Sequence, residues 1–507
     1  MELYIGKTYL WLPVCREGKK EIVSIFFQKE KIHEFEIGMG NTDDFYAFIN
    51  VSEYRGKKIV INGGNPFFEQ MLRVEDNKPD YREKQRPRLH FTTEVGWMND
   101  PNGLIYKDGW WHMFFQHNPY GNEWGNMHWG HAKSHDLMNW EQLEEAVYPD
   151  KYGAAFSGCA VEDKEGVAGL GKGSILFYYT AATNTPAWHS ESEYTQKVLY
   201  SVDGGNTLMK MEVGGVPWIE GFNRDPKIIY YEPTKRYIMV LYLDKNDFMI
   251  LESENLLSWK RLQRITLEKA WECPDLLEVP VENEVGQTKW IFWSADGFYF
   301  LGNFDGKQFV TDGKCREAYG NRLPYAAQSY WGTGKRCISQ SWLRTPYKGG
   351  NYTGMMALPV ELCLQKENGD YFICLRPVKE VEKLRKGHKN VEIDGKCKYL
   401  FSEENGPKEV NVSIPWQEEG EIELILYGKA VHIDFDTQEL FFESNRACIP
   451  EKESFCLQVF LDFGAIEIFA QEGRVYLPCA WDIEELEGEI AVCNETLGLA
   501  KATVFEL

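Results

Sequence analysis

A weak internal repeat of strand-and-turn segments is the feature of this chain that most constrains its fold. It occurs at residues 134–140 (Ser-His-Asp-Leu-Met-Asn-Trp), at 253–259 (Ser-Glu-Asn-Leu-Leu-Ser-Trp) and, more loosely, at 201–208 (Ser-Val-Asp-Gly-Gly-Asn-Thr-Leu). Each copy follows an apolar strand, as a turn that closes a repeated sheet does. Repeats of roughly 40–50 residues built from four short strands are typical of propeller blades. The repeat therefore predicts a β-propeller of five slightly longer blades between about Arg88 and Leu375.

The rest of the chain is also patterned as short strands, alternating or wholly apolar, separated by Gly, Asn and Asp. Clear examples are residues 22–27, 58–61, 110–116, 174–180, 237–243, 290–294, 422–427, 431–435, 455–461 and 466–469. Helical spacing appears at 375–385, after Pro377, and predicts a linker helix. We therefore expect an all-β chain with an N-terminal accessory β domain (1–85), a five-bladed propeller (86–375), the linker helix (376–390) and a C-terminal β-sandwich (391–507).

The composition limits the classes of partner that this chain is expected to bind. A formal net charge of -22 disfavours nucleic acid and anionic membranes, whereas an aromatic share of 14% suits stacking against neutral sugars. No stretch approaches the roughly 18 apolar residues of a membrane span. The N-terminus has no secretory pattern, and the twelve cysteines form no C-x-x-C pair. We expect free thiols and a cytoplasmic protein, or a secreted one if a leader has been removed; the oligomeric state stays open.

Three acidic motifs are candidates for chemistry. Residues 97–103 (Trp-Met-Asn-Asp-Pro-Asn-Gly) predict a rigid turn that holds Asp100 among amide donors, which favour the ionised carboxylate. In residues 222–227 (Phe-Asn-Arg-Asp-Pro-Lys), Arg224 beside Asp225 could hold neighbouring sugar hydroxyls. In residues 271–276 (Trp-Glu-Cys-Pro-Asp-Leu), apolar neighbours are expected to raise the pKa of Glu272, as a general acid requires.

The spacing of these acids fits a propeller. About 125 residues separate Asp100 from Asp225 and about 47 separate Asp225 from Glu272, or about two blades and one blade. Innermost strands could therefore bring all three to the central axis. Two carboxylates in opposite environments suit a glycosidase, one as nucleophile and one as acid/base.

On these residues the chain resembles glycoside hydrolase family 32, the β-fructosidases (invertases, inulinases, levanases and fructan exohydrolases). The matching segments are 97–103, 115–119 (Phe-Gln-His-Asn-Pro), 124–125, 129–131, 156–158, 224–226, 272–274, 325–329 (Tyr-Ala-Ala-Gln-Ser) and 466–469. The family fold is a five-bladed propeller followed by a β-sandwich, which agrees with the expectation from the strand pattern.

The resemblance implies roles for individual residues. Asp100 would be the nucleophile that attacks the anomeric carbon of a fructosyl unit, Glu272 the acid/base, and Asp225 the group that steadies the fructose hydroxyls and the transition state. The implied mechanism is retaining, with the two reacting carboxyls roughly 5–5.5 Å apart. No cofactor or metal is implied. The substrate-binding residues would be Trp97, Asn99, Gln116, Trp124, Phe156, Ser157, Arg224 and Tyr325.

One departure from the family bears on the substrate. Leu323 and Pro324 stand where many relatives have an acidic–aromatic pair that helps hold the glucose of sucrose, so the chain leans towards fructan-type substrates. The leading function is an exo-acting β-fructosidase that releases fructose from fructooligosaccharides, inulin- or levan-type fructans or sucrose. A transfructosylase with the same pocket and a non-catalytic fructan-binding propeller are the alternatives. We interpret residues 1–85 as a packing extension rather than a carbohydrate-binding domain.

Two other patterns suggest chemistry less strongly. A metal site is disfavoured for a histidine cluster, because Gly125, Trp129 and Gly130 argue against the helix that its spacing would need. Cys273 has no histidine nearby in the sequence, so we expect it to pack against Glu272 and tune it rather than act as a nucleophile. The clustered histidines are His112, His117, His128, His131 and His135.

Overall fold

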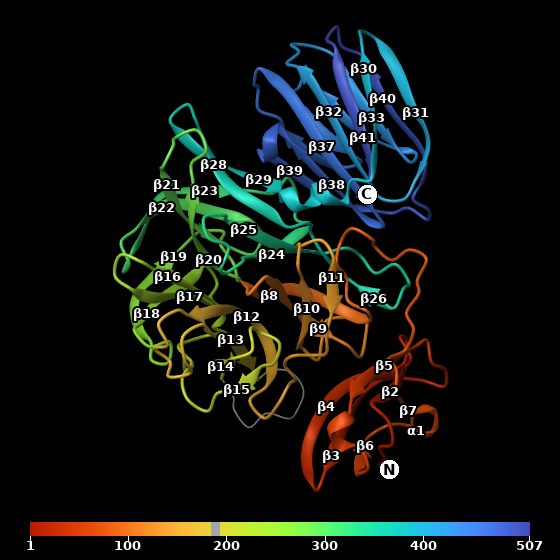
Figure 1. Cartoon of the computed structure of the whole chain (residues 1–507), viewed down its shortest axis with the longest axis vertical. Coiled ribbons are helices and arrows are strands. Elements are labelled where there is room, and N and C mark those ends of the chain that lie inside the picture. The colour runs from red at the N-terminus through yellow and green to blue at the C-terminus, as the bar shows by residue number, and fades with distance from the viewer. Residues whose placement is uncertain (184–192) are drawn as a thin grey trace.

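The computed structural model describes residues 1–183 and 193–507, and shows a chain built almost entirely of strands (Figure 1). A small β domain (red in Figure 1), a larger central body and a sandwich (blue) follow in chain order. The helices of the described residues are short: α1 (Pro66–Met71) and the 3-10 turns η1 (Ser52–Tyr54), η2 (Lys379–Leu384) and η3 (Gln471–Gly473). Among the described residues, no helix has the length and apolar content to cross a membrane.

The central body consists, within the described residues, of five consecutive sheets whose neighbouring strands are antiparallel except at β26. Innermost strands of successive sheets contact one another, and those of the fifth and first sheets also touch, so the sheets form a ring. This is the arrangement of a β-propeller, and the five-bladed form stays a prediction. With the strands of each sheet given from the centre outward, the first sheet comprises β8 (Gly96–Lys107), β9 (Trp110–Asn118), β10 (His128–Ser134) and β11 (Trp140–Gln142), with β26 (Tyr352–Thr353) beside β8, and the second comprises β12 (Ala154–Asp163), β13 (Ser174–Ala182), β14 (Thr195–Ser201) and β15 (Met209–Lys210). The third comprises β16 (Arg224–Tyr231), β17 (Arg236–Asp244), β18 (Asp247–Ser253) and β19 (Lys260–Thr266), and the fourth comprises β20 (Asp275–Pro280), β21 (Thr288–Trp293), β22 (Phe298–Phe304) and β23 (Phe309–Glu317). The fifth comprises β24 (Pro324–Ser329), β25 (Ile338–Leu343), β28 (Val360–Glu367) and β29 (Asp370–Pro377), with β27 (Met355–Met356) beside β25.

The repeated turns close the third strands of three sheets, as the sequence predicts. Ser134, Ser201 and Ser253 end β10, β14 and β18. Each serine Oγ bonds the carboxylate or amide two residues later, at 3.0 Å for Asp136, 2.7 Å for Asp203 and 3.2 Å for Asn255. These local side-chain bonds stabilise the turn into the outer strand, which explains why the motif recurs.

The C-terminal body is a β-sandwich of two sheets with an apolar core between them. The segment predicted as a linker helix forms only the short turn η2, because β29 and the first sandwich strand occupy residues on either side of it. One sheet comprises β30 (Gly387–Ile393), β41 (Ala500–Glu506), β32 (Lys408–Pro415), β37 (Ser454–Asp462), β38 (Gly464–Ala470) and β39 (Val475–Trp481); the other comprises β31 (Cys397–Asn405), β40 (Glu487–Asn494), β33 (Glu421–Leu426), β34 (Lys429–Asp434), β35 (Glu439–Phe442) and β36 (Asn445–Cys448).

The N-terminal body also consists of two small sheets around an apolar core. That core includes Val95 and Tyr120, which belong to the propeller side of the chain, so the two bodies share packing. The strands are β1 (Glu2–Tyr4), β6 (Lys58–Asn62), β3 (Lys19–Phe27) and β4 (Glu30–Met39) in one sheet, and β5 (Phe45–Asn50), β2 (Tyr9–Val14) and β7 (Arg73–Glu75) in the other.

Candidate active site

Four innermost strands of the propeller lose their regular pairing at the residues that matter most. The register shifts between Met98 and Pro101 in β8 and between Ala155 and Gly158 in β12. It also shifts within β16 and β24. An irregularity of this kind re-aims side chains, and such features are frequent beside active sites. The register shifts therefore turn the motif side chains away from the directions that regular strand pairing would give them, at one level of the ring of sheets.

The turn predicted at residues 97–103 is wrong. Asp100 lies inside β8, because pairing with β9 continues on both sides of the irregularity. The Asn-Asp-Pro-Asn-Gly composition, which indicates a turn in isolation, is accommodated here by two register shifts in the strand. Asp100 is still held on a stiff support, but by a sheet.

The backbone around the acids adopts conformations that are uncommon for residues with a side chain. The φ angles are +59° at Asp225, +44° at Glu272, +39° at Cys273 and +53° at Ala326. Each such residue carries strain that the surrounding structure must hold, and such strain clusters at functional sites. Three of these positions belong to the predicted catalytic motifs.

A hollow of about 450 Å³ collects the predicted catalytic acids, a size that suits a small ligand. Asp100, Asp225 and Glu272 all line it, although they come from three different sheets or their connections. The other lining residues are Asn99, Gln116, Trp124, Phe156, Ser157, Tyr194, Phe222, Arg224, Tyr325 and Trp342.

One predicted substrate-binding residue lies outside this lining. Trp97 stands behind the hollow, where its Nε1 donates to Asn99 Oδ1 at 2.9 Å and its ring packs edge-on against Trp342 at 5.6 Å. Trp97 therefore orients Asn99 and does not line the hollow itself. Side chains two residues apart normally face the same side of a strand, but the register shift in β8 prevents that here. Tyr194 and Trp342 are lining residues that the sequence reasoning missed, since neither belongs to a recognised motif.

The rim of the hollow is a chain of aromatic rings. Trp124 contacts Phe156 with ring centres 5.8 Å apart, Phe156 contacts Tyr194 at 5.8 Å, and Tyr194 contacts Phe222 at 5.6 Å. Trp124 and Phe222 remain 48% and 57% exposed, which is unusual for such large apolar side chains. Exposed aromatic faces beside carboxylates suit a ligand with both apolar C–H faces and hydroxyl groups.

Asp100 accepts hydrogen bonds from three side chains. Ser157 Oγ donates at 2.6 Å, Asn99 Nδ2 at 3.1 Å and Cys273 Sγ at 3.6 Å. Burial raises the pKa of Asp100, and the charge of Glu272 raises it further, while these bonds oppose the shift. The predicted amide donor Asn99 is present, and its bond favours the ionised form as expected, but burial has the larger effect on the pKa.

Asp225 is buried beside Asp100. Burial raises the pKa of Asp225 to about 7, against the lowering effect of the Arg224 charge, with further increases from Glu272 and Asp100. The Cys273 amide and thiol approach Asp225 Oδ2 at 3.2 and 3.5 Å. Burial, followed by the aspartate charges, raises the pKa of Cys273 well above its usual value, so its thiol remains a donor. The hydrogen bonds of Cys273 go to the aspartates, which the sequence did not predict, and the packing of Cys273 against Glu272 stays a prediction.

Glu272 is surrounded by polar partners, which corrects the apolar environment predicted for it. Arg224 Nη2 contacts one carboxylate oxygen, and the Tyr325 hydroxyl donates to the other at 2.5 Å. The neighbouring Trp271 points elsewhere, with its ring 5.6 Å from that of Tyr242. The Glu272 side chain keeps 21% of its surface exposed, so the ion pair stands open to the hollow.

The clustered histidines do not assemble around one point. They lie on β9 and β10 or directly after β10, and His112 Nδ1 lies 3.0 Å from His131 Nε2. His117 pairs with Glu145 at 2.7 Å. In the part of the chain that the structure describes, no group of His, Cys, Asp and Glu has the geometry to hold a metal ion.

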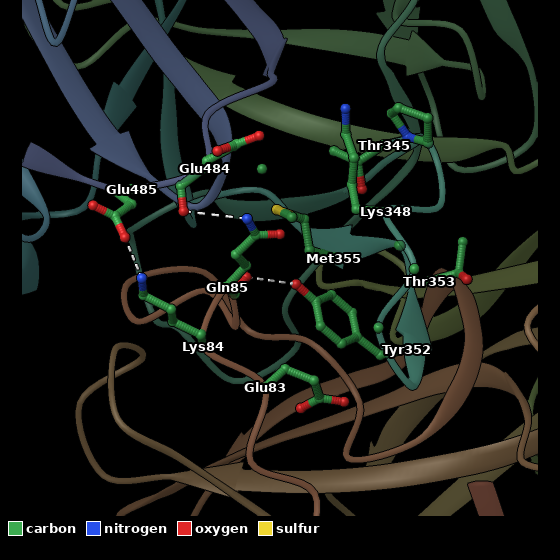
Figure 2. Close-up of a pocket in the computed structure, with 15 residues that line it drawn as sticks. Glu83, Lys84, Gln85, Thr345, Lys348, Tyr352, Thr353, Met355, Glu484 and Glu485 are labelled. Atoms are coloured by element: carbon green, nitrogen blue, oxygen red, sulfur yellow. Dashed lines mark hydrogen bonds and ion pairs between the residues drawn. The ribbon is translucent and has the colours of Figure 1, made fainter. Parts of the chain in front are cut away.

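A separate hollow of about 380 Å³ lies where the connector between β7 and β8 (residues 76–95), the propeller and the sandwich meet (Figure 2). Tyr352 OH donates to the Gln85 carbonyl at 3.0 Å, and Gln85 Nε2 donates to the Glu484 carbonyl at 3.2 Å. Lys84 pairs with Glu485. These bonds join the connector to the propeller and to the sandwich. None of Asp100, Asp225 and Glu272 lines this hollow.

Comparison with known proteins places this site in a family. Residues 90–374 match the model of the glycosyl hydrolases family 32 N-terminal domain. The chain is 34% identical over 362 residues to a levanase of Bacillus subtilis, covering 64% of this chain and 52% of the levanase. It is 36% identical over 255 residues to an extracellular exo-inulinase of Meyerozyma guilliermondii, covering 45% and 48%. The chain thus spans about half the length of these curated relatives.

Solved structures share the fold. A fructofuranosidase from Schwanniomyces occidentalis complexed with fructosylnystose aligns with a TM-score of 0.75 and 23% identity, covering 85% of this chain and 99% of that one. Fructan 1-exohydrolase IIa from Cichorium intybus aligns with a TM-score of 0.68 and 20% identity, covering 84% and 98%.

Proposed function

The chain belongs to glycoside hydrolase family 32, and from that premise we propose that it is a retaining, exo-acting β-fructosidase. The observation that carries the proposal is the common hollow of Asp100, Asp225 and Glu272. Relatives named levanase, exo-inulinase and invertase support a fructoside as the substrate. The lining of aromatic rings and neutral amides supports a neutral sugar.

In the proposed reaction, Asp100 attacks the anomeric carbon of a terminal fructosyl unit while Glu272 protonates the departing oxygen. The resulting ester between fructose and Asp100 is then hydrolysed by a water molecule that Glu272 deprotonates. Ser157 and Asn99 fix the orientation of the Asp100 carboxylate through the bonds described above. Positive charge developing on the sugar would favour the ionised form of Asp100, which burial by itself disfavours.

Arg224, Tyr325 and Asp225 have positioning and binding roles in this scheme. Arg224 and the Tyr325 hydroxyl hold both oxygens of Glu272, so that the carboxyl keeps one orientation. Burial and the charge of Glu272 raise the pKa of Tyr325, which keeps its hydroxyl a donor. Asp225 is proposed to accept hydrogen bonds from fructose hydroxyls.

We propose fructan-type oligosaccharides as better substrates than sucrose, because Leu323 and Pro324 provide no acid for a glucose unit. The test is to incubate the protein with sucrose, inulin, levan and short fructooligosaccharides and to follow free fructose. Steady release of fructose is expected, fastest from the oligosaccharides. Growing oligosaccharides would show transfer instead of hydrolysis, mixed oligomers from levan would show internal cleavage, and binding without any product would show a lectin-like protein.

A further inference from the structure

The N-terminal domain reaches the rim of the active site through the loop at residues 119–127, which joins β9 to β10. Both ends of this loop are fixed to β4. The Tyr120 ring stacks on Phe35, with centres 4.1 Å apart, inside the core of the N-terminal domain. Asn126 exchanges two hydrogen bonds of 2.8 Å with the backbone of Glu36. Trp124 lies between these two anchors, so the N-terminal domain sets the position of this rim residue.

Charged side chains hold the middle of the same loop. Lys20 Nζ lies 2.7 Å from Glu123 Oε2, and Arg16 Nε donates to Asn122 Oδ1 at 3.4 Å. Arg16 also reaches a second propeller segment, where its Nη2 donates to the Gly350 carbonyl at 3.1 Å and to Asn351 Oδ1 at 2.8 Å. One arginine of the N-terminal domain therefore joins two loops of the propeller.

A second hollow, of about 170 Å³, lies beside this loop. Trp124 lines both this hollow and the acidic one, so its indole stands between the two. Arg16, Lys20 and Asn122 contribute donors to the walls, and Tyr347 contributes a ring that is 40% exposed. The Arg16 guanidinium is held 5.9 Å from the centre of the Tyr347 ring.

Asn122 provides an independent sign of a ligand. Its Oδ1 accepts from Arg16, but its buried Nδ2 has no hydrogen-bond partner among the described residues. A buried amide donor without a hydrogen-bond partner is unfavourable, and an acceptor on a ligand would satisfy it. A hydroxylated sugar beside an aromatic ring offers such an acceptor.

We propose that the hollow between the N-terminal domain and the Trp124 loop is a subsite for the sugar units that follow the cleaved fructosyl unit. The inference rests on the proposed function and adds to it the place where the further units of an oligosaccharide substrate bind. The scissile bond lies on the acidic side of Trp124, and the chain continues past the indole to the amide of Asn122 and the ring of Tyr347. This assigns the N-terminal domain a part in substrate selection, in place of the packing role predicted from the sequence.

The test compares kcat/KM for sucrose with that for inulin-type tri- and tetrasaccharides. The wild type should prefer the longer substrates. Tyr347→Ala should reduce kcat/KM for the tetrasaccharide about three- to tenfold, the range of an aromatic contact, mainly by raising KM. Asn122→Ala should act in the same direction, and the effect of both variants should shrink as the substrate becomes shorter. Tyr4→Ala, an exposed tyrosine of β1, is the matched control.

The outcomes separate the inference from the proposed function. Equal losses on every substrate would assign these residues a structural role and overturn the subsite, as would variants that match the wild type on the tetrasaccharide. A wild type indifferent to chain length would overturn it as well, while leaving β-fructosidase activity intact. Failure of the wild type to release fructose from any fructoside would instead refute the proposed function.

Discussion

Two clusters of buried acids in this molecule resemble each other in composition and differ in how completely they are paired. In the active site, Asp100 and Asp225 share the uncharged thiol of Cys273, and among the described residues their nearest ion-pair contact is the longer one of 3.8 Å from Arg224 Nε to Asp225. At the junction of propeller and sandwich, His90 lies fully buried between Asp462, at 3.0 Å, and Glu467, at 2.7 Å. We call this second group the junction cluster.

The two acids of the junction cluster have several hydrogen-bond donors besides His90. The backbone amides of Leu89 and His90 donate to Asp462 at 2.7 and 2.9 Å. The Leu358 amide donates to Glu467 at 2.7 Å, and so does the Tyr476 hydroxyl at 2.5 Å. Burial alone would lower the pKa of His90, but hydrogen bonds and charges from Asp462 and Glu467 raise it to about 9. The histidine is therefore charged at neutral pH and joins two bodies of the chain.

The difference shows what partners do to a buried carboxylate. Complete pairing offsets the cost of burying such a group, so that removing one partner is strongly destabilising, whereas incomplete pairing leaves the charged form of the buried carboxylate disfavoured. We therefore expect substitutions in the acidic hollow to abolish activity without unfolding the protein, and substitutions in the junction cluster to do the reverse.

Removing the reacting carboxyls should have the largest effect. Asp100→Asn and Glu272→Gln each remove a group that the proposed mechanism needs, and should lower kcat/KM at least about a thousandfold. Because burial penalises the charge of Asp100, the melting temperature of Asp100→Asn should equal or exceed that of the wild type. Steady-state kinetics and calorimetry on the same samples test both statements. Turnover like that of the wild type in either variant would refute the assigned roles.

Breaking the junction cluster should destabilise the fold instead. Asp462→Ala leaves His90 charged and partly unpaired, and breaking a buried pair in this way costs about 3–5 kcal/mol. The protein that remains folded should keep its kcat, because the cluster does not touch the hollow. Chemical denaturation measures the first effect and active-site-normalised kinetics the second. A normal stability with a reduced kcat would reverse the contrast drawn here.

The pH range over which the stability of the protein changes should differ between the two clusters. The folded-state pKa of His90, about 9, exceeds the usual 6.5, so its stabilisation is complete below pH 6.5 and is lost as the pH rises through 9. The pKa of Asp225 rises from 3.8 to about 7, so its ionisation reduces stability as the pH rises between these values.

Melting temperatures measured from pH 4 to pH 10 test these signs. Asp225→Asn should become more stable relative to the wild type as the pH rises from about 4 to about 7. His90→Gln should be most destabilised below pH 6.5 and approach the wild type near pH 9. Parallel curves for the wild type and both variants would show that neither group titrates as described.

The smallest effect is expected at Tyr325. Tyr325→Phe removes the hydroxyl that donates to Glu272 but keeps the ring. The loss of one hydrogen bond, about 1 kcal/mol, should lower kcat/KM about fivefold with little change in melting temperature. Tyr242→Phe serves as a control, because the Tyr242 ring, rather than its hydroxyl, contacts Arg224. A loss as large as that of Glu272→Gln would make the Tyr325 hydroxyl part of the chemistry.

The sequence predicts the active site better than it predicts the junction cluster. Asp100, Asp225 and Glu272 lie in local motifs whose spacing follows the blade repeat, so their convergence is foreseeable. The orientation of the Trp97 side chain is not, because a register shift in β8 changes which face a residue joins. The contacts of Cys273 are not foreseeable either, because this residue lies in the connection between β19 and β20, outside any strand. No local signal links His90 to Asp462, since these residues meet only after the sandwich has packed against the propeller.

The fold shows the same division. The alternating strand pattern and the repeated turns that begin at residues such as Ser134 are local signals, and they predict the sheets correctly. The segment 376–390 was predicted as a helix because its spacing is helical, yet pairing of β29 and β30 with their neighbours limits it to the turn η2. Likewise, the position of Trp124 depends on contacts with β4, which no pattern within its own loop encodes.

Trapping the fructosyl–enzyme intermediate would show directly whether Asp100 is the nucleophile. Glu272→Gln, incubated with an activated fructoside that needs no protonation of its leaving group, should accumulate the intermediate because hydrolysis lacks its base. Peptide mapping by mass spectrometry should then find one added fructosyl group on the peptide that contains Asp100, and none in Asp100→Asn. A fructosyl group on another residue, or release of inverted fructose without any adduct, would contradict the account.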